Sequence, residues 1–282
     1  MAKIDYRGGI AALLLMALAA LPTRVQANHS WGNYHWARTT ASFTLKLGDN
    51  VSGAWDPYLL EIAGSALHPD WTESTKLDLS IVAGGASGNL RRCLPTAGRV
   101  EVCNTTYGNN GWLGVASIWA NGDHITQATV KLNDTYFNTA TYNTPAWRRL
   151  VMCQEVGHAF GLDHQDETFS NPNLGTCMDY TNDPSGTLAN PDQLSNEYPN
   201  GHDYDQLITI YSHTDSSTTV AQTVAAGNAM AAHERGNADE PEHRGTSQWG
   251  KLVRSTNNGR TESYELDLGR GQKMITHVIW AE

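Results

Sequence analysis

The feature that most restricts the fold of this chain is a helix expected over residues 145–161. Thr144 can cap its first turn, and Pro145 suits the first helical position, where an N–H group would have no intrahelical partner. Gly161 can end the helix in a left-handed turn. The apolar face of this helix is formed by Trp147, Leu150, Val151 and the residues one turn further on. Such a face has to be buried against a second layer of structure.

Extended segments precede this helix and indicate what the second layer is. The segments with strand character are 41–47, 77–84, 99–104, 114–120 and 128–133. Two further helices are expected, over residues 55–67 and over residues 201–213. The order of strand, helix, strands and helix predicts an α+β fold built of mixed α/β layers.

Residues 1–27 have the composition of a secretory signal peptide. Lys3 and Arg7 give a positive start, residues 10–21 are apolar, and Ala27 ends an acceptable cleavage site. The alternative is a membrane anchor, but the apolar run is shorter than the ~20 residues that a spanning helix needs. We therefore expect a secreted protein, extracellular or periplasmic, without a membrane anchor.

The rest of the chain divides into three parts. Residues 28–214 are enough for one sizeable domain. Residues 215–245 are rich in Ser, Thr, Ala and charged residues and lack periodicity, which is typical of a linker. Residues 246–282 contain two extended runs around Asn258-Gly259, a pair that favours a hairpin turn. A small C-terminal β-hairpin region is therefore expected.

The cysteines indicate disulfide bonds, and the net charge argues against one class of partner. An even number of cysteines, here four, suggests two disulfides in a secreted chain. Four cysteines allow three pairings, of which we favour the one that includes the short local loop Cys93–Cys103. The formal net charge of −10 argues against nucleic acid as a partner, because nucleic acid requires a basic surface.

Residues 153–164, CQEVGHAFGLDH, bring several polar side chains towards one point. Positions i and i+4 of a helix lie on the same face, so Gln154 and His158 point the same way. After a turn at Gly161 the chain can bring His164 towards them, with Glu155 beside the cluster. This is the spacing H-E-x-x-H-x-x-G-x-x-H with glutamine at the first position, and a methionine follows in GTCMDYTND.

On this motif the chain resembles the metzincin zinc metalloproteases, and it looks most like a matrixin-type domain. The resemblance covers about residues 30–213 and includes GVASIWANGDHITQATVKLN, which is similar to the substrate-binding edge strand and its neighbour. It implies a twisted, mostly parallel five-stranded sheet with an edge strand, an active-site helix, a Met-turn and a C-terminal helix. The activity that it implies is that of a zinc-dependent endopeptidase.

The resemblance also implies roles for individual residues. His158 and His164 would bind one catalytic Zn2+, Glu155 would be the general base and acid, and Met178 would form a hydrophobic floor beneath the metal. No motif indicates a structural Ca2+ ion. Gln154 departs from the family pattern, and two interpretations stay open. It is either a third, weaker zinc ligand or a non-ligating residue in an inactive site.

Two neighbours of the motif can compensate for a weak ligand. Tyr180 resembles the tyrosine that, in some members of the family, reaches the zinc or the oxyanion; the alternative is that it only packs. In the resembled fold the active-site helix lies against the Met-turn, so a Cys153–Cys177 disulfide would join the two. The alternative for Cys153 is a thiolate ligand.

Other titratable residues lie near the motif or stand alone. The carboxylates around His164 either accept its second imidazole N–H or form a solvated acidic loop; they are Asp163, Asp166 and Glu167. Three isolated histidines are expected to be surface or packing residues rather than ligands: His124, His202 and His213.

The resemblance implies a protein or peptide substrate that pairs with the edge strand near Val115–Trp119. No propeptide or cysteine-switch motif is visible before the first strand, so the usual device for latency is not expected. One alternative to a protease is a catalytically impaired module that keeps the fold and binds a partner. Another is a hydrolase with a different substrate, because fold does not fix function.

Overall fold

The computed structural model describes residues 28–86, 90–187, 193–222, 248–256 and 258–281. The expected signal peptide and most of the expected linker lie outside these described residues. Within them, no helix is both long and apolar enough to span a bilayer.

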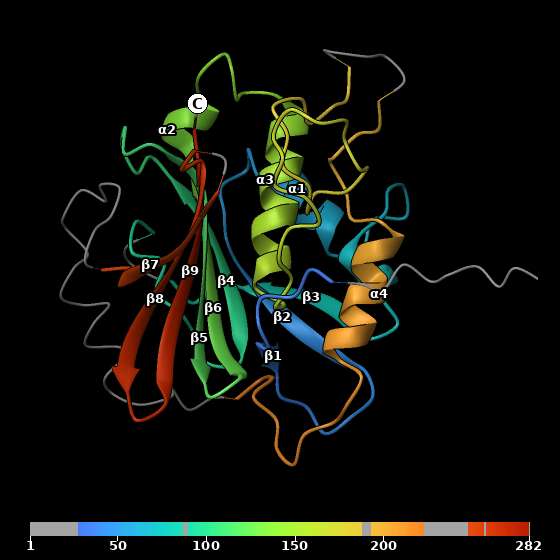
Figure 1. Cartoon of the computed structure of the whole chain (residues 1–282), viewed down its shortest axis with the longest axis vertical. Helices are drawn as coiled ribbons and strands as arrows, with labels where there is room; N and C mark the ends of the chain where they lie inside the picture. The colour runs from blue at the N-terminus through green and yellow to red at the C-terminus, as the bar shows by residue number, and fades with distance from the viewer. Residues whose placement is uncertain (1–27, 87–89, 188–192, 223–247, 257, 282) are drawn as a thin grey trace, which may run out of the picture.

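One large mixed sheet dominates the molecule (Figure 1). Its strands follow the order β3-β2-β4-β6-β5-β9-β8-β7, and β1 pairs with β6 outside that path. The strands are β1 (His35–Trp36), β2 (Phe43–Asn50), β3 (Leu77–Ala83), β4 (Arg99–Thr105), β5 (Trp112–Asn121), β6 (His124–Asn133), β7 (Lys251–Thr256), β8 (Thr261–Gly269) and β9 (Gln272–Trp280). Strands β1, β2, β3, β4 and β6 run parallel to their neighbours in this group, whereas β5 and β7–β9 pair antiparallel.

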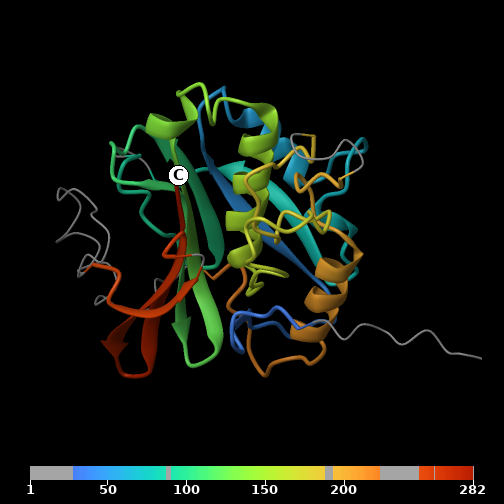
Figure 2. The ribbon, with the colours of Figure 1, turned by 45° about the horizontal axis from the view of Figure 1, so that its top comes forward.

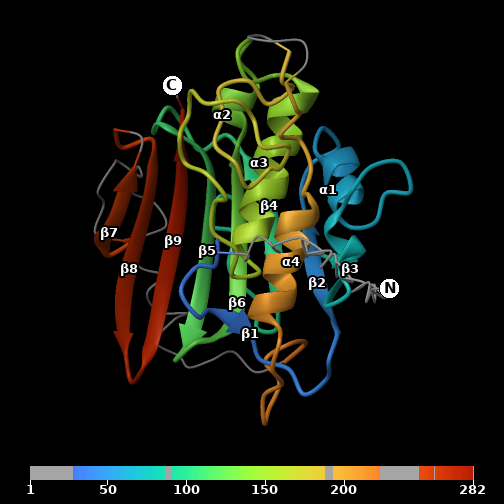
Figure 3. The ribbon, with the colours of Figure 1, turned by 45° about the vertical axis from the view of Figure 1, so that its right-hand side comes forward.

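The predicted five-stranded, mostly parallel sheet is therefore wrong: the sheet is mixed and has nine strands. The error arises at β5, which the metzincin resemblance implied to be an edge strand. Its second edge is paired with β9, and β8 and β7 extend the sheet further, as the red strands in Figures 2 and 3 show. The hairpin expected around Asn258-Gly259 is present as β7 and β8, and β8 joins it to the main sheet through β9.

Within the described ranges, four α-helices and one 3-10 turn accompany the sheet. They are α1 (Asp56–Ile62), η1 (Trp71–Glu73), α2 (Asp134–Phe137), α3 (Pro145–His158) and α4 (Gly201–Ile210). Helix α3 begins as predicted, because the Thr144 hydroxyl accepts a hydrogen bond from the Trp147 amide at 3.3 Å. It packs on β5 and α1 (Figure 1). Helix α1 ends earlier than predicted, before Gly64, whose φ of +130° is incompatible with a helix.

Strand β9 separates two apolar cores. Its side chains alternate, so Ile275 and Ile279 join the main core, on the α3 side. Met274 and Val278 face the other side and join a second core, which also contains Trp112, Val115, Trp119, Trp249, Tyr264 and Trp280. By this alternation His277 lies on the same side of the sheet as α3.

Both expected disulfides are present. Cys93 bonds to Cys103 beside β4, and Cys153 of α3 bonds to Cys177, the residue before Met178. The second bond excludes the thiolate ligand that was an alternative for Cys153. It also ties α3 directly to the turn around Met178.

Candidate functional site

Three histidines from distant parts of the chain meet on the α3 side of the sheet. His158 ends α3, His164 follows in the next loop, and His277 comes from β9. One ring nitrogen from each lies within 4.8 Å of the others, and the Nε2 atoms of His158 and His164 are 3.2 Å apart. Their exposed fractions are 0 %, 6 % and 1 %, so water is largely excluded from the cluster.

Local backbone and side-chain contacts set the position of the first two rings. Gly161 has a φ of +93°, and a Cβ there would lie 2.1 Å from the Tyr34 carbonyl oxygen, so only glycine can make this turn. The Nδ1 atom of His158 is 2.9 Å from the Leu162 carbonyl oxygen, to which it can donate. This bond leaves Nε2 of His158 free to face its neighbours.

Glu167 performs the same task for His164. Its carboxylate lies 3.2 Å from Nδ1 of His164, so it can accept that N–H and leave Nε2 as a lone-pair donor. The carboxylates of Glu167 and Asp163 both pair with Arg254 of β7. The loop is therefore a paired acidic cluster and not only a solvated one. Asp166 instead accepts hydrogen bonds from Thr168 and Asn171 within the loop.

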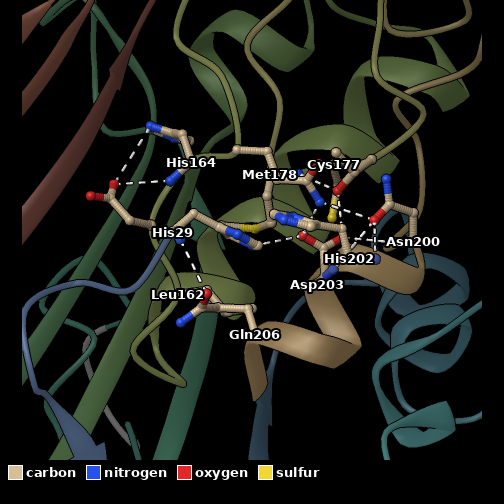
Figure 4. A network of polar contacts seen from close by, with 12 residues as sticks. His29, Leu162, His164, Cys177, Met178, Asn200, His202, Asp203 and Gln206 are labelled. Atoms are coloured by element: carbon tan, nitrogen blue, oxygen red, sulfur yellow. Dashed lines mark hydrogen bonds and ion pairs between the residues drawn. The ribbon is translucent and has the colours of Figure 1, made fainter. Parts of the chain in front are cut away.

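A second polar network, centred on Asp203, holds the loop that carries His164 (Figure 4). Asp203 at the start of α4 is 3.0 Å from Nε2 of His29, and it accepts hydrogen bonds from Gln165 and from the Thr176 hydroxyl. These bonds join α4 and the amino-terminal segment to the two loops that carry His164 and Met178. His202 stacks on His29 with ring centroids 4.8 Å apart, as expected of a packing histidine.

The electrostatic environment keeps all three imidazoles neutral. Burial lowers the pKa of His158 to about 3 and the pKa of His164 to about 4, and it lowers the pKa of His277 well below its ordinary value. Neither nitrogen of His277 has a hydrogen-bond partner among the described residues. A buried polar group without a partner is unfavourable, and neutral imidazole is a preferred zinc ligand. The cluster therefore fits a divalent metal ion such as Zn2+.

Glu155 lies one helical turn before His158 on α3 and is fully buried. Gly114 of β5 makes room for it, since a Cβ there would lie 2.6 Å from one carboxylate oxygen. Neither carboxylate oxygen has a hydrogen-bond partner within ordinary distance and angle limits among the described residues. Burial raises the pKa of Glu155 well above its ordinary value, and the backbone N–H of Ala116 offsets this only in part.

Gln154 is also buried, and it lines a small, mostly apolar pocket. The other residues of this pocket are Leu113, Tyr142, Trp147, Leu150, Phe169, Asp179, Tyr180, Thr181, Ile279 and Trp280. The amide nitrogen of Gln154 has no hydrogen-bond partner among the described residues. A role of Gln154 as a metal ligand stays a prediction.

Tyr180 lies beside His164, and Met178 lies against α3. The Tyr180 ring stands edge-on to His164 with centroids 5.1 Å apart, but its hydroxyl donates to the Arg260 carbonyl oxygen at 3.0 Å. Met178 is buried against α3, because a Cβ on Gly157 would lie 2.6 Å from its sulfur. The catalytic role of Tyr180 stays a prediction.

The place expected for a peptide substrate is occupied by the chain itself. Strand β9 pairs antiparallel with β5, and Val115 and Trp119 face Val278 and Met274. The hydroxyls of Ser117 and Thr276 also meet at 2.9 Å. In this structure β5 therefore has no free edge.

Sequence reasoning missed His277, although one indication was available. The run ITHVIW alternates as a strand does, and it places a single imidazole between Ile275 and Ile279 on an otherwise apolar face. No protein-family profile matches the sequence, and no curated protein is similar to it at a significant level.

Proposed function

We propose that this chain is a zinc-dependent hydrolase of peptide bonds, in which His158, His164 and His277 hold the ion and Glu155 is the general base. One observation carries the proposal: three buried, neutral imidazoles converge one helical turn from a buried carboxylate that lacks regular hydrogen bonds. The resemblance of residues 154–164 to the metzincin motif supports the same chemistry.

His277 supplies the imidazole that the motif lacks at Gln154. Three imidazoles are a common catalytic set for zinc, whereas an amide oxygen is a harder and weaker donor. In this proposal Gln154 is therefore not required as a ligand. Its side chain lines the adjacent pocket beside Tyr180.

A zinc ion with three protein ligands supplies a bound water of lowered pKa and polarises the scissile carbonyl. Glu155 accepts the proton of the attacking water and delivers it to the leaving amine. Burial favours this exchange, because a raised pKa brings the carboxyl group closer to neutral pH. Glu167 holds His164 in the tautomer whose Nε2 faces the cluster.

In the described conformation strand β9 blocks the edge of β5 to a peptide substrate. An extended peptide binds most simply by adding to a free strand edge, and β9 already holds that position on β5. Peptide binding along β5 therefore requires β9 to move away from that edge. The two disulfides favour an oxidising compartment, which agrees with secretion.

The same closure favours a second candidate function, a metal-binding module without catalysis. Glu155 and His158 are fully buried, and no substrate reaches them while β9 stays in place. The two candidates differ in one observable, which is turnover.

The test is cleavage of a mixed peptide library by the zinc-loaded protein, with and without a chelator. Glu155→Gln is the active-site variant, and Glu73→Gln, at an exposed carboxylate, is the matched control. A protease cuts peptides, stops with the chelator, and loses activity only in Glu155→Gln. Zinc binding by folded protein without any cleavage in the parent would reject the protease and leave the metal-binding module.

A further inference from the structure

A second cluster of histidines lies around β1 and the start of β6, and it shares no residue with the first. His35 of β1, His124 at the start of β6 and His213 after α4 all approach Asp215. Their Nε2 atoms are 3.5, 3.2 and 3.6 Å from the same carboxylate oxygen, Oδ1. The Nε2 atoms of His35 and His213 are 3.2 Å apart.

These distances lie at or beyond the long end of the hydrogen-bond range, and they also match the spacing of ligand atoms around an ion. Zinc–nitrogen and zinc–oxygen bonds near 2.0–2.2 Å place tetrahedral ligand atoms about 3.3–3.5 Å apart. Direct N–H···O hydrogen bonds are shorter, typically about 2.9 Å. Two of the imidazoles and the carboxylate are therefore spaced to hold a cation between them, and His124 contacts the same carboxylate oxygen. His35, His213 and Asp215 already lie within 4.8 Å of one another.

The partners of these side chains leave the ligand atoms free. Nδ1 of His35 is 2.7 Å from the Asn33 carbonyl oxygen, so it can donate there and keep Nε2 as a lone-pair donor. The other carboxylate oxygen of Asp215, Oδ2, accepts the Arg38 backbone N–H at 3.0 Å. This contact orients the carboxylate with Oδ1 towards the imidazoles.

We propose that His35, His124, His213 and Asp215 form a structural zinc site. Four protein ligands leave no open position, which is the arrangement of structural and not of catalytic zinc. His124 is the ligand that has to adjust, and its side chain is 40 % exposed, so it is free to do so. Figure 1 shows the segment after α4 turning back below β1, where the ion would fasten it. The proposal does not depend on the proposed hydrolase activity.

This site corrects an expectation from the sequence. His124 and His213 look isolated there, but the structure brings both to Asp215. The half-exposed ring of His213 also gives the ion a path from solvent.

The first test is zinc stoichiometry, measured on the purified full chain after equilibrium dialysis in a zinc buffer. We expect about two ions per chain for the parent, because each cluster holds one. The double variant His213→Asn/Asp215→Asn should hold one ion fewer, and His68→Asn, outside both clusters, should match the parent. An unchanged stoichiometry in the double variant overturns the proposal.

The second test needs no variant and so does not depend on folding. An imidazole-acylating reagent is applied to the parent protein with and without bound zinc, and modified peptides are mapped. His213, whose side chain is 50 % exposed, should react in the zinc-free protein and be protected at least about tenfold when zinc is present in excess of its dissociation constant. Equal modification of His213 in both samples contradicts a zinc ion at this cluster.

Discussion

The two histidine clusters differ in burial, in ligand type and in what surrounds them. The first contains only imidazoles, is almost fully buried, and has the carboxylate of Glu155 one helical turn away. The second includes the carboxylate of Asp215 among its ligand groups and keeps two of its rings half exposed. Three ligands leave a coordination position for a reacting water, whereas four close the sphere. In the two proposals, similar side chains therefore have different roles: the first cluster would hold a catalytic ion, and the second would hold a structural one.

The largest expected effect is a loss of peptide cleavage, which only the first cluster is proposed to support. Glu155→Gln should reduce peptide cleavage by about 10²–10⁴-fold, because general acid–base catalysis contributes roughly that much. Zinc content should stay at the parental value for both clusters, since Glu155 is not a ligand in either. Steady-state kinetics and metal analysis on the same samples check this. A variant with parental turnover would mean that the first cluster does not use Glu155 as its base.

The next effect separates His277 from Gln154 within the first cluster. His277→Ala should weaken zinc binding there by more than about 100-fold, because even the outer partners of ligands are worth roughly 10–100-fold. Gln154→Ala should change that affinity by less than about tenfold. Competition with a fluorescent zinc chelator measures both, in a background that carries the second-cluster double variant. The reverse order of the two effects would restore Gln154 as the third ligand.

A smaller effect concerns the strand that covers the first cluster. Ser117 and Thr276 face each other on β5 and β9, so cysteines at both positions are well placed for a disulfide. If peptides enter only when β9 moves, the oxidised Ser117→Cys/Thr276→Cys protein should cleave at least about tenfold more slowly, and mild reduction should restore the rate. The parent under the same reductant is the control. Full activity of the oxidised form would place the substrate elsewhere.

A last effect, on stability and not on activity, is a pH dependence that the buried cluster should show without metal. The pKa values of His158 and His164 are about 3 and about 4 in the folded chain, below the ordinary value near 6.5. Between pH 6.5 and 4 the unfolded chain therefore binds protons that the folded chain does not. The free energy of unfolding should fall as the pH falls through this window, by up to about 1.4 kcal/mol per pH unit for each histidine.

Thermal unfolding of zinc-free protein at pH 7 and pH 5 checks this last expectation. The variant His158→Asn/His164→Asn should show a smaller difference between the two pH values. His124→Asn/His213→Asn, at the half-exposed cluster, should behave like the parent. An equal pH dependence of stability in all three proteins would show that the burial of His158 and His164 is not its cause.

The sequence predicted features that depend on local spacing, and it failed where distant segments pair. The cap at Thr144, the turn at Gly161 and the approach of His164 to His158 all follow from residues within one or two turns. Both disulfides were also anticipated. Nothing local, however, states that β9 pairs with β5, because the alternation of a strand gives its faces but not its partner.

The missed residues of both clusters share that cause. His277 reaches the first cluster only through the β5–β9 ladder. His35 and His124 meet through the pairing of β1 with β6. Asp215 joins them because its backbone N–H donates a hydrogen bond to the Arg38 carbonyl oxygen. Each of these contacts links segments far apart along the chain, so no window of sequence contains it.

The position of β9 inside the sheet also sets an order of assembly. Ser117 and Thr276 are 159 residues apart, and the entropic cost of closing a loop grows with its length. His158 and His164 are only 6 residues apart and can meet much earlier during refolding. If the first cluster binds zinc as proposed, a refolding chain would offer the ion two imidazoles first and the third only when the β5–β9 ladder has closed. Tight retention of zinc there would then show that the sheet is complete.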